Sequence, residues 1–215
     1  MTNNDDDSVI TTCSSSQAMS FFRKREKMKK EQFKQLKEKF GEYASFAIWE
    51  SENNVKDISM FDDDNIAEKL NDKYIFVALN PAKRPADEKV EILKNFHSDY
   101  PYQKDFKLCH ALKNTRFWGA YLTDLYKSFH ENDSAKLNKL LKENPDLVQQ
   151  DKQSLLKELE ILSNVKVIFA LGRMTEKHLR KLLNDKYEIV YVRHYSYRSS
   201  KESYRNVVEE ALKNY

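Results

Sequence analysis

The chain has 215 residues, of which 40% are hydrophobic and 33% are charged, and its formal net charge is +3. This length fits one domain with a sizeable core, and the composition is typical of a soluble globular protein. No apolar run approaches the roughly 18 residues of a membrane-spanning helix, and the N-terminus lacks the basic and apolar regions of a secretory signal. We therefore expect a cytoplasmic protein that does not bind a membrane.

The cysteines, histidines and glycines exclude several kinds of site. The two cysteines, Cys13 and Cys109, form no Cys-x-x-Cys pair, which excludes a disulfide framework, an iron–sulfur cluster and a four-cysteine zinc site. The five histidines show no metal-ligand spacing, and the three glycines form no phosphate-binding loop. We therefore expect no metal and no cofactor, and a nucleoside-triphosphatase or dinucleotide-binding function is disfavoured.

The N-terminal part of the chain is polar at first and then helical. Residues 1–17 are rich in Asp and Ser, which predicts a disordered leader. A helix is predicted over residues 19–40, where apolar residues recur at helical spacing. Residues 23–39 hold nine Lys or Arg against three Glu, so this helix either has a solvated charged face or contacts phosphates. We interpret residues 18–72 as a helical extension packed on the core.

Four short apolar runs predict the strands of the core, at residues 73–80, 119–126, 165–171 and 187–193. Amphipathic segments predict helices at residues 63–71, 86–96, 104–114, 134–143, 147–163, 174–184 and 200–213. Residues 46–49 are either another short strand or an extended cover segment. Near-continuous apolar strands joined by long connections are typical of a parallel sheet covered on both faces. The sequence therefore predicts a three-layer α/β/α domain over residues 73–215, with a central four-stranded, mainly parallel sheet.

Polar residues lie at the ends of these four strands. Asn80 and Pro81 follow the first strand, Asp124 lies in the second, Gly172 follows the third, and His194 follows the fourth. Because open α/β sheets bind ligands at the carboxyl ends of their strands, we expect these residues to face one cleft. Each motif alone has a structural explanation, since Asn-Pro is a common turn and a lone histidine is usually structural. Their order on successive strands is the informative feature.

This pattern resembles the uracil-DNA glycosylase superfamily over roughly residues 73–212. Asn80–Pro81 is similar to the Asn-Pro or Asp-Pro that follows the family's first strand. His194–Ser196 (His-Tyr-Ser) is similar to the His-Pro-Ser after its last strand. Residues 121–127 are similar to the family's strand that bears Thr-Asn and a following Lys, and residues 167–172 to its penultimate strand, which ends in Gly.

The resemblance implies a DNA N-glycosylase, a hydrolase that releases a deaminated or damaged base such as uracil. Cleaving the N-glycosidic bond forms an oxocarbenium-like sugar and a departing base anion, so a positioned water and donors to the developing charge are needed. The resemblance assigns the water to Asn80 and the donor role to a neutral His194, as the catalytic residues. The flipped base needs a pocket with an aromatic platform, either Phe96 or Tyr100. The implied substrate-binding residues are Pro81, Ala82, Phe96, Tyr100, Asp124, Gly172 and Ser196.

Basic and aromatic residues near the strand ends predict contacts with DNA. They are Lys83, Arg84, Arg173, Arg193, Tyr197 and Arg198. We expect the cations to ring the mouth of the cleft and contact phosphates. The expected partner is DNA, for which a single-stranded form is one option, and the chain is expected to act as a monomer.

Three residues depart from the family pattern. Tyr195 stands where Pro is usual, Ala82 where Gly is usual, and Asp124 where a base-reading Asn is common. An ionised Asp only accepts hydrogen bonds, so Asp124 favours a base with an amino group or N–H and disfavours a carbonyl such as uracil O4. Two other functions stay open: a nucleic-acid- or nucleotide-binding protein of the same fold without glycosylase activity, and an unrelated doubly wound nucleotide-metabolising enzyme.

Overall fold

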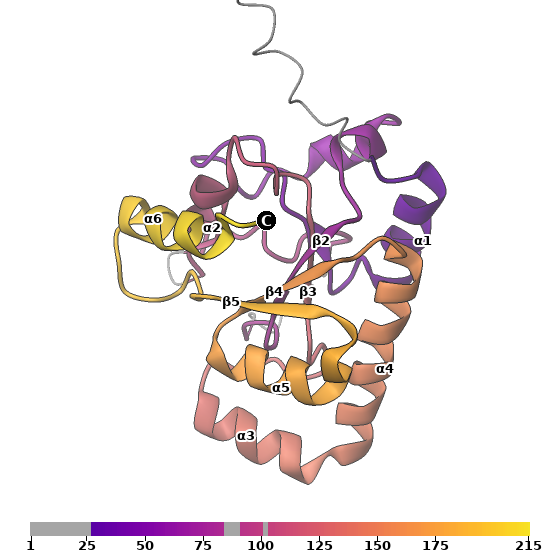
Figure 1. The fold of residues 1–215 in the computed structure, drawn as a ribbon, viewed down its shortest axis with the longest axis vertical. Coiled ribbons are helices and arrows are strands. Elements are labelled where there is room, and N and C mark those ends of the chain that lie inside the picture. Colours follow the sequence, from indigo (N-terminus) through magenta and orange to yellow (C-terminus); the bar gives the residue numbers. More distant parts are fainter. Residues whose placement is uncertain (1–26, 84–90, 101–102) are drawn as a thin grey trace, which may run out of the picture.

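A five-stranded mixed sheet organises the chain, of which the computed structural model describes residues 27–83, 91–100 and 103–215 (Figure 1). The expected leader, residues 1–17, lies outside the described residues, and so does Arg84. Among the helices of the described part, none is long and apolar enough to cross a membrane.

The strands include all four that the apolar runs predict. In chain order they are β1 (Ser45–Phe46), β2 (Tyr74–Ala78), β3 (Tyr121–Asp124), β4 (Val167–Leu171) and β5 (Glu188–Val192). Across the sheet the order is β1-β3-β2-β4-β5, and β2 to β5 are parallel. The expected number of four strands is wrong, because the short β1 pairs antiparallel with β3 and adds a fifth. The strand alternative for residues 46–49 therefore holds only at Phe46.

The central strands are apolar along their whole length because both faces of the sheet are covered. In β2, Ile75 and Val77 belong to the core on one face, whereas Phe76 and Ala78 belong to the core on the other. Successive side chains of a strand point to opposite faces, so an uninterrupted apolar run is what such a position requires. Phe76 also stacks on Phe169 of β4, with ring centroids 4.8 Å apart.

Six α-helices occur in the described residues. They are α1 (Lys30–Phe40), α2 (Asp105–Leu112), α3 (Ser134–Glu143), α4 (Pro145–Leu162), α5 (Arg173–Leu183) and α6 (Lys201–Leu212). Three of these helices start with ordinary capping chemistry. The Asp133 carboxylate accepts backbone N–H groups at the start of α3, Pro145 opens α4, and the Ser200 hydroxyl accepts the Ser203 N–H at the start of α6.

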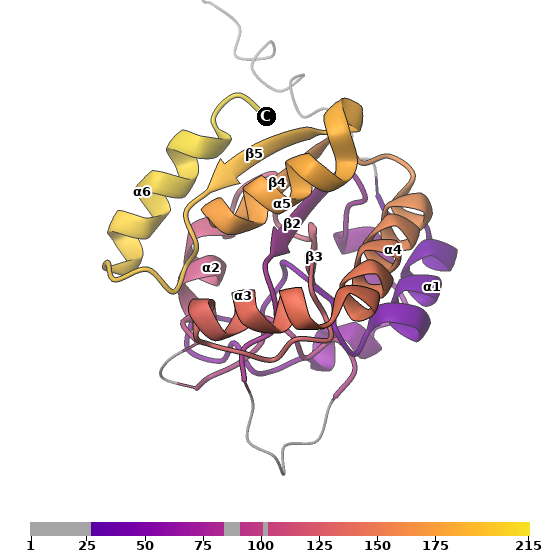
Figure 2. The same ribbon diagram turned by 90° about the horizontal axis from the view of Figure 1, so that it is seen from below.

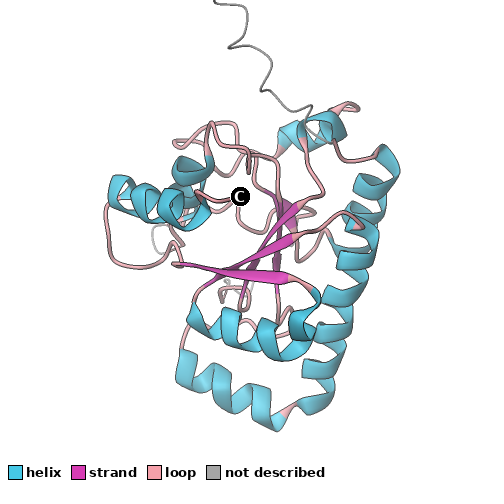
Figure 3. Cartoon of the chain, in the orientation of Figure 1, coloured by secondary structure: helices cyan, strands magenta, loops and turns pink. Residues whose placement is uncertain are grey.

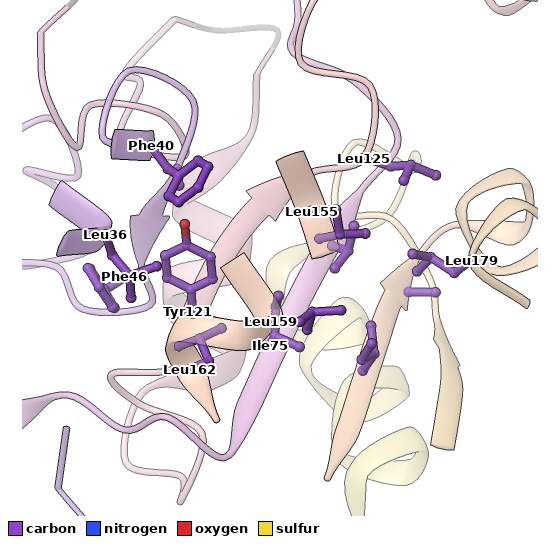
Figure 4. Close-up of a cluster of buried hydrophobic side chains, with 14 of the residues drawn as sticks. Leu36, Phe40, Phe46, Ile75, Tyr121, Leu125, Leu155, Leu159, Leu162 and Leu179 are labelled. Atoms are coloured by element: carbon purple, nitrogen blue, oxygen red, sulfur yellow. The ribbon is translucent and has the colours of Figure 1, made fainter. Parts of the chain in front are cut away.

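The helices form layers on both faces of the sheet (Figures 2 and 3). One core contains apolar side chains of α1, α4 and α5, such as Leu36 and Leu159, together with side chains of the sheet such as Phe46 of β1 (Figure 4). The other core contains side chains of α2 and α6, which pack against each other and the opposite face. The segment from residue 27 to residue 72 thus supplies β1, α1 and part of both cores.

Two expected helices are wrong in the described residues, and a third is shorter than expected. Within 63–71 the chain forms only the 3₁₀ turn η2 (Ile66–Lys69). Residues 91–96 form turns rather than the end of a helix over 86–96, whose first part lies outside the described residues. Leu93 and Phe96 have φ values of 64° and 65°, which a right-handed helix excludes. The helix expected over 19–40 begins at Lys30 in the described part.

Candidate functional site

A pocket of about 500 Å³ lies at the carboxyl ends of the parallel strands. The chain runs from β2 outward to β3 and then returns to β4 on the other side of β2, so the strand order reverses there. Open α/β sheets bind ligands in the crevice at such a reversal. The volume falls in the range of roughly 300–1,000 Å³ that is typical of small-molecule sites. The pocket walls include residues that follow β2 and β5 and much of the segment 94–105.

The structure brings most of the expected site residues together. Those that line the pocket are Asn80, Pro81, Ala82, Phe96, Tyr100, Asp124, His194 and Ser196. The prediction that Asn80 and His194 face a common cleft is therefore confirmed. Gly172 does not line the pocket formed by the described residues, contrary to expectation. It turns the chain from β4 into α5 with a φ of 106°, and a Cβ added there would lie 3.9 Å from the Cβ of His194.

The amide of Asn80 is held by the backbone of the neighbouring wall. Its Nδ2 donates to the carbonyl oxygens of Phe129 and Glu131, each at 2.8 Å, and to that of Pro81 at 3.0 Å. Both amide hydrogens are thereby engaged, and the side chain is fixed in one orientation. Oδ1 is the atom of Asn80 that remains to accept a hydrogen from a water or ligand.

His194 is held as a neutral imidazole of defined tautomer. The backbone N–H of Ser196 donates to Nδ1 at 3.1 Å, and the Ser196 hydroxyl lies 2.8 Å from the same atom. Because a backbone N–H only donates, Nδ1 must be the acceptor, and Nε2 carries the proton. Burial lowers the pKa of His194 to about 4, so the ring is neutral at neutral pH. The ring also stacks on Tyr195, with centroids 4.4 Å apart. His194 thus offers one oriented N–H donor.

Asp124 forms a polar pair with a residue that the sequence pattern did not reveal. The buried Asp124 carboxylate accepts the Nδ2 of Asn95 at 2.7 Å through Oδ2, and Asn95 also donates to the carbonyl of Tyr43 at 2.6 Å. Both amide hydrogens of Asn95 are used, so its Oδ1 is an acceptor. Asp124 and Asn95 both line the pocket, and together they make this side of it rich in acceptors.

Tyr195, which follows His194, anchors the loop after β5. Its ring is buried, and its hydroxyl hydrogen-bonds to the carboxylate of Asp105 at the start of α2. Burial and the nearby carboxylates of Asp105 and Asp124 raise the pKa of Tyr195 well above its usual value. Asp105 also accepts the backbone N–H of Ser98 at 2.8 Å. Asp105 therefore ties together the loop that carries His194 and the loop that carries Phe96.

The expected ring of cations around the mouth of this pocket stays a prediction. None of Lys83, Arg173, Arg193 and Arg198 lines it. The guanidinium of Arg173, the first residue of α5, lies over the ring of Tyr191 in β5 at 3.5 Å and pairs with Glu176. Lys83 is exposed.

Tyr197 and Arg198 lie instead in a second, smaller pocket next to the first. The guanidinium of Arg193 covers the ring of Tyr197 at 4.8 Å. Of the residues expected to contact DNA, the three that follow β5 are therefore grouped together.

In the part of the chain that the structure describes, no three His, Cys, Asp or Glu side chains gather as a metal-binding group. The pocket offers four hydrogen-bonding groups: an acceptor at Asn80, a donor at His194, and acceptors at Asp124 and Asn95. No protein-family model matches the sequence, and no curated protein matches it either.

Proposed function

We propose that the chain is a hydrolase of the N-glycosidic bond between a damaged or deaminated base and deoxyribose in DNA. The observation that carries this proposal is the meeting of Asn80 and His194 in one pocket, although they follow the first and the last of the parallel strands. This placement agrees with the resemblance to the uracil-DNA glycosylase superfamily, which rests on the same two motifs.

In the proposed chemistry, the Nε2–H donor of His194 and the Oδ1 acceptor of Asn80 act on opposite sides of the N-glycosidic bond. As the bond lengthens, negative charge develops on a carbonyl oxygen of the base, and the Nε2–H of His194 donates to it. A fixed donor that needs no reorganisation stabilises the transition state more than the ground state. Oδ1 of Asn80 accepts a hydrogen bond from the water that attacks the anomeric carbon. The proton that this water loses as the new C–O bond forms passes to the departing base anion, so that the products are the free base and an abasic sugar. The pKa of about 4 keeps His194 a neutral donor throughout the physiological range.

The acceptors on the Asp124 side define the class of base. A carboxylate and an amide oxygen at this position bind an amino group or a ring N–H, and they repel a carbonyl. Uracil presents O4 beside its N3–H, whereas a base with an exocyclic amino group at that edge presents donors. We therefore propose that bases with an amino group there are preferred over uracil.

A second function, binding of a nucleic acid or nucleotide without hydrolysis, is favoured by one specific observation. The amide hydrogens of Asn80 are all directed to backbone carbonyls, which is sufficient to explain the residue as a support for the pocket wall. In that case the same pocket would hold a base without activating a water.

The two functions are separated by incubation of the protein with a panel of lesion-containing oligonucleotides, single- and double-stranded, followed by alkaline cleavage at abasic sites. If a base is released, His194→Ala should lower the single-turnover rate by about 10²–10³, as expected for loss of one donor to a developing anion. Asn80→Ala should lower it by about 10²–10⁴. DNA affinity should change little in both, because phosphate contacts supply most of it.

The matched control is His178→Ala, which removes a half-buried histidine that bonds Tyr126 and lies outside the pocket. Its rate should equal that of the wild type. Thermal melting of each variant separates loss of chemistry from loss of fold, which matters for Asn80 because three backbone contacts disappear with its amide. Equal rates for the wild type and both pocket variants would refute the assigned roles. Binding without base release across the panel would favour the second function.

A further inference from the structure

A second pocket, of about 410 Å³, adjoins the first and shares Ser196 with it. It lies between the start of α2 and the loop that leads from β5 into α6. Its polar lining consists of four cations and four hydroxyl groups, from Lys104, Lys107, Arg198, Lys201, Ser196, Tyr197, Ser199 and Ser200. Of the cations, Lys201 also pairs with Glu52 at 2.6 Å. No Asp or Glu is among the described residues that line it. The lining is therefore chemically suited to an anion.

Lys107 is the most informative member of this lining. Only 5% of its surface is exposed, and its Nζ donates to the carbonyl of Tyr197 at 2.9 Å. Across the described parts of the chain, no carboxylate pairs with it. Lysine is almost never buried without a counter-ion, because desolvating the ammonium group is costly. The equally buried Lys127 obeys that rule, since its Nζ lies 3.1 Å from Glu158 Oε1. The described residues therefore supply no carboxylate to balance the positive charge of Lys107.

Two neighbouring side chains extend the match to a phosphate. Ser199 Oγ is buried and has no hydrogen-bond partner within the described residues. Burial and the charge of Lys104 lower the pKa of Lys107. An anion between the two lysines would offset both the desolvation of the Lys107 ammonium group and its repulsion by Lys104. A phosphate has several acceptor oxygens and a charge, and lysine ammonium groups and hydroxyls are common partners for it.

The surroundings of the pocket favour a phosphate that belongs to a nucleotide. Tyr197 is 56% exposed, with the guanidinium of Arg193 over its ring at 4.8 Å, and it forms part of the lining. An exposed aromatic ring beside a cationic groove is the usual platform on which single-stranded bases stack. Because the two pockets share Ser196, this anion-binding position lies directly beside the pocket proposed for the base.

We infer that the second pocket is a phosphate subsite, in which Lys107 and Lys104 bind the phosphoryl group of a nucleotide or a nucleic-acid strand. The identity of the neighbouring base-binding pocket rests on the proposed function, but the binding of phosphate does not. The two can therefore fail separately.

The test is a titration of the full-length protein at constant ionic strength with three probes: inorganic phosphate, thymidine 5′-monophosphate and a short single-stranded oligodeoxynucleotide. Thymidine without phosphate is the negative control. The variants are Lys107→Met, which keeps the apolar stem, and Lys104→Gln, which changes a more exposed residue. Lys113→Met is the matched control, because Lys113 is exposed at the end of the same helix and outside both pockets.

The wild type and Lys113→Met should bind the phosphorylated probes equally well. Lys107→Met should weaken that binding by about tenfold or more, and Lys104→Gln should weaken it as well, as expected for loss of a charge-assisted contact. For the oligonucleotide, the log-log salt slope should fall by about 0.7 for each cation removed. Binding of phosphate and the monophosphate without the oligonucleotide would assign the subsite to free nucleotides, and binding of all three would assign it to a strand.

The inference is overturned if the wild type binds none of the phosphorylated probes, or if Lys107→Met binds them as tightly as the wild type does. Should Lys107→Met fail to fold, an unchanged affinity of Lys104→Gln has the same meaning. Phosphate binding that depends on Lys107, without release of any base, would refute the proposed hydrolase and leave the subsite. Base release without phosphate binding would refute the phosphate subsite and leave the proposed hydrolase.

Discussion

Acidification should destabilise the fold through one buried imidazole, that of His97. The ring is fully buried, with its centroid 5.4 Å from that of Trp49 and 5.5 Å from that of Phe61. Its Nδ1 lies 3.2 Å from the carbonyl oxygen of Val55, which can only accept a hydrogen. Burial lowers the pKa of His97 from 6.5 to about 3. The folded protein therefore keeps this residue neutral where an unfolded chain would protonate it.

The magnitude follows from the two pKa values. Above pH 6.5 both states are neutral at this residue, and it contributes no pH dependence. As the pH falls below 6.5, His97 becomes protonated in the unfolded state but stays neutral in the folded state. The free energy of unfolding therefore falls by up to about 1.4 kcal/mol per pH unit. The loss ends only near pH 3, where the folded state is protonated too. Between pH 7 and about pH 4.5, His97 alone should cost about 2.5 kcal/mol.

The measurement is urea unfolding of the wild type and His97→Gln at several pH values in this range. Glutamine does not titrate, and its amide can still donate to Val55. Carboxylates and the other histidines titrate alike in both proteins, so their effects cancel in the difference between the two free energies of unfolding. The free energy of unfolding of the wild type minus that of the variant should fall by about 2.5 kcal/mol from pH 7 to pH 4.5. A difference that does not change with pH would refute the reasoning.

Three further substitutions test other parts of the structure. Lys127→Met should lower the free energy of unfolding by about 3–5 kcal/mol because it leaves buried Glu158 unpaired, and adding Glu158→Leu should restore most of it; an undiminished loss in the double variant would contradict this. Gly172→Ala should cost roughly 1–3 kcal/mol in denaturant unfolding because its backbone conformation is almost confined to glycine, and wild-type stability would argue against it. Asp124→Asn should shift base release in the oligonucleotide panel towards bases with a carbonyl, since an amide can also donate; an unchanged order of preference would exclude Asp124 as the base-reading residue.

The parts of the fold that the sequence predicts are those fixed by local pattern. The strands β2 and β4 are apolar on both faces, and short uninterrupted apolar runs bounded by polar residues are typical of such buried strands. Helix α6 can also be predicted from the sequence, because Ser200 precedes its first turn as an N-cap. The polar residues at strand ends follow from the same reading, which is why Asn80 and His194 could be placed together before the fold was known.

The errors lie where distant contacts override local preference. Leu93 and Phe96 have helical spacing, yet both take positive φ values. The backbone of Leu93 is held by the carbonyl of Gly41 at 2.6 Å and by the hydroxyl of Ser45 at 2.7 Å, about fifty residues earlier in the chain. No pattern within the segment reveals those partners. Asn95 escaped prediction for the same reason, since only the turn conformation brings its amide to Asp124.

The two asparagines of the pocket also couple the site to the stability of the whole molecule. Asn80 joins the end of β2 to the carbonyl of Phe129, 49 residues away, and Asn95 joins its loop to the carbonyl of Tyr43, 52 residues away. Because these hydrogen bonds join residues far apart in the sequence, the pocket cannot open without breaking contacts between remote parts of the chain. Backbone amides around the pocket should therefore exchange with solvent mainly through global unfolding. A bound ligand would then slow that exchange by the same factor by which it shifts the folding equilibrium, so hydrogen exchange at these amides reports occupancy of the site.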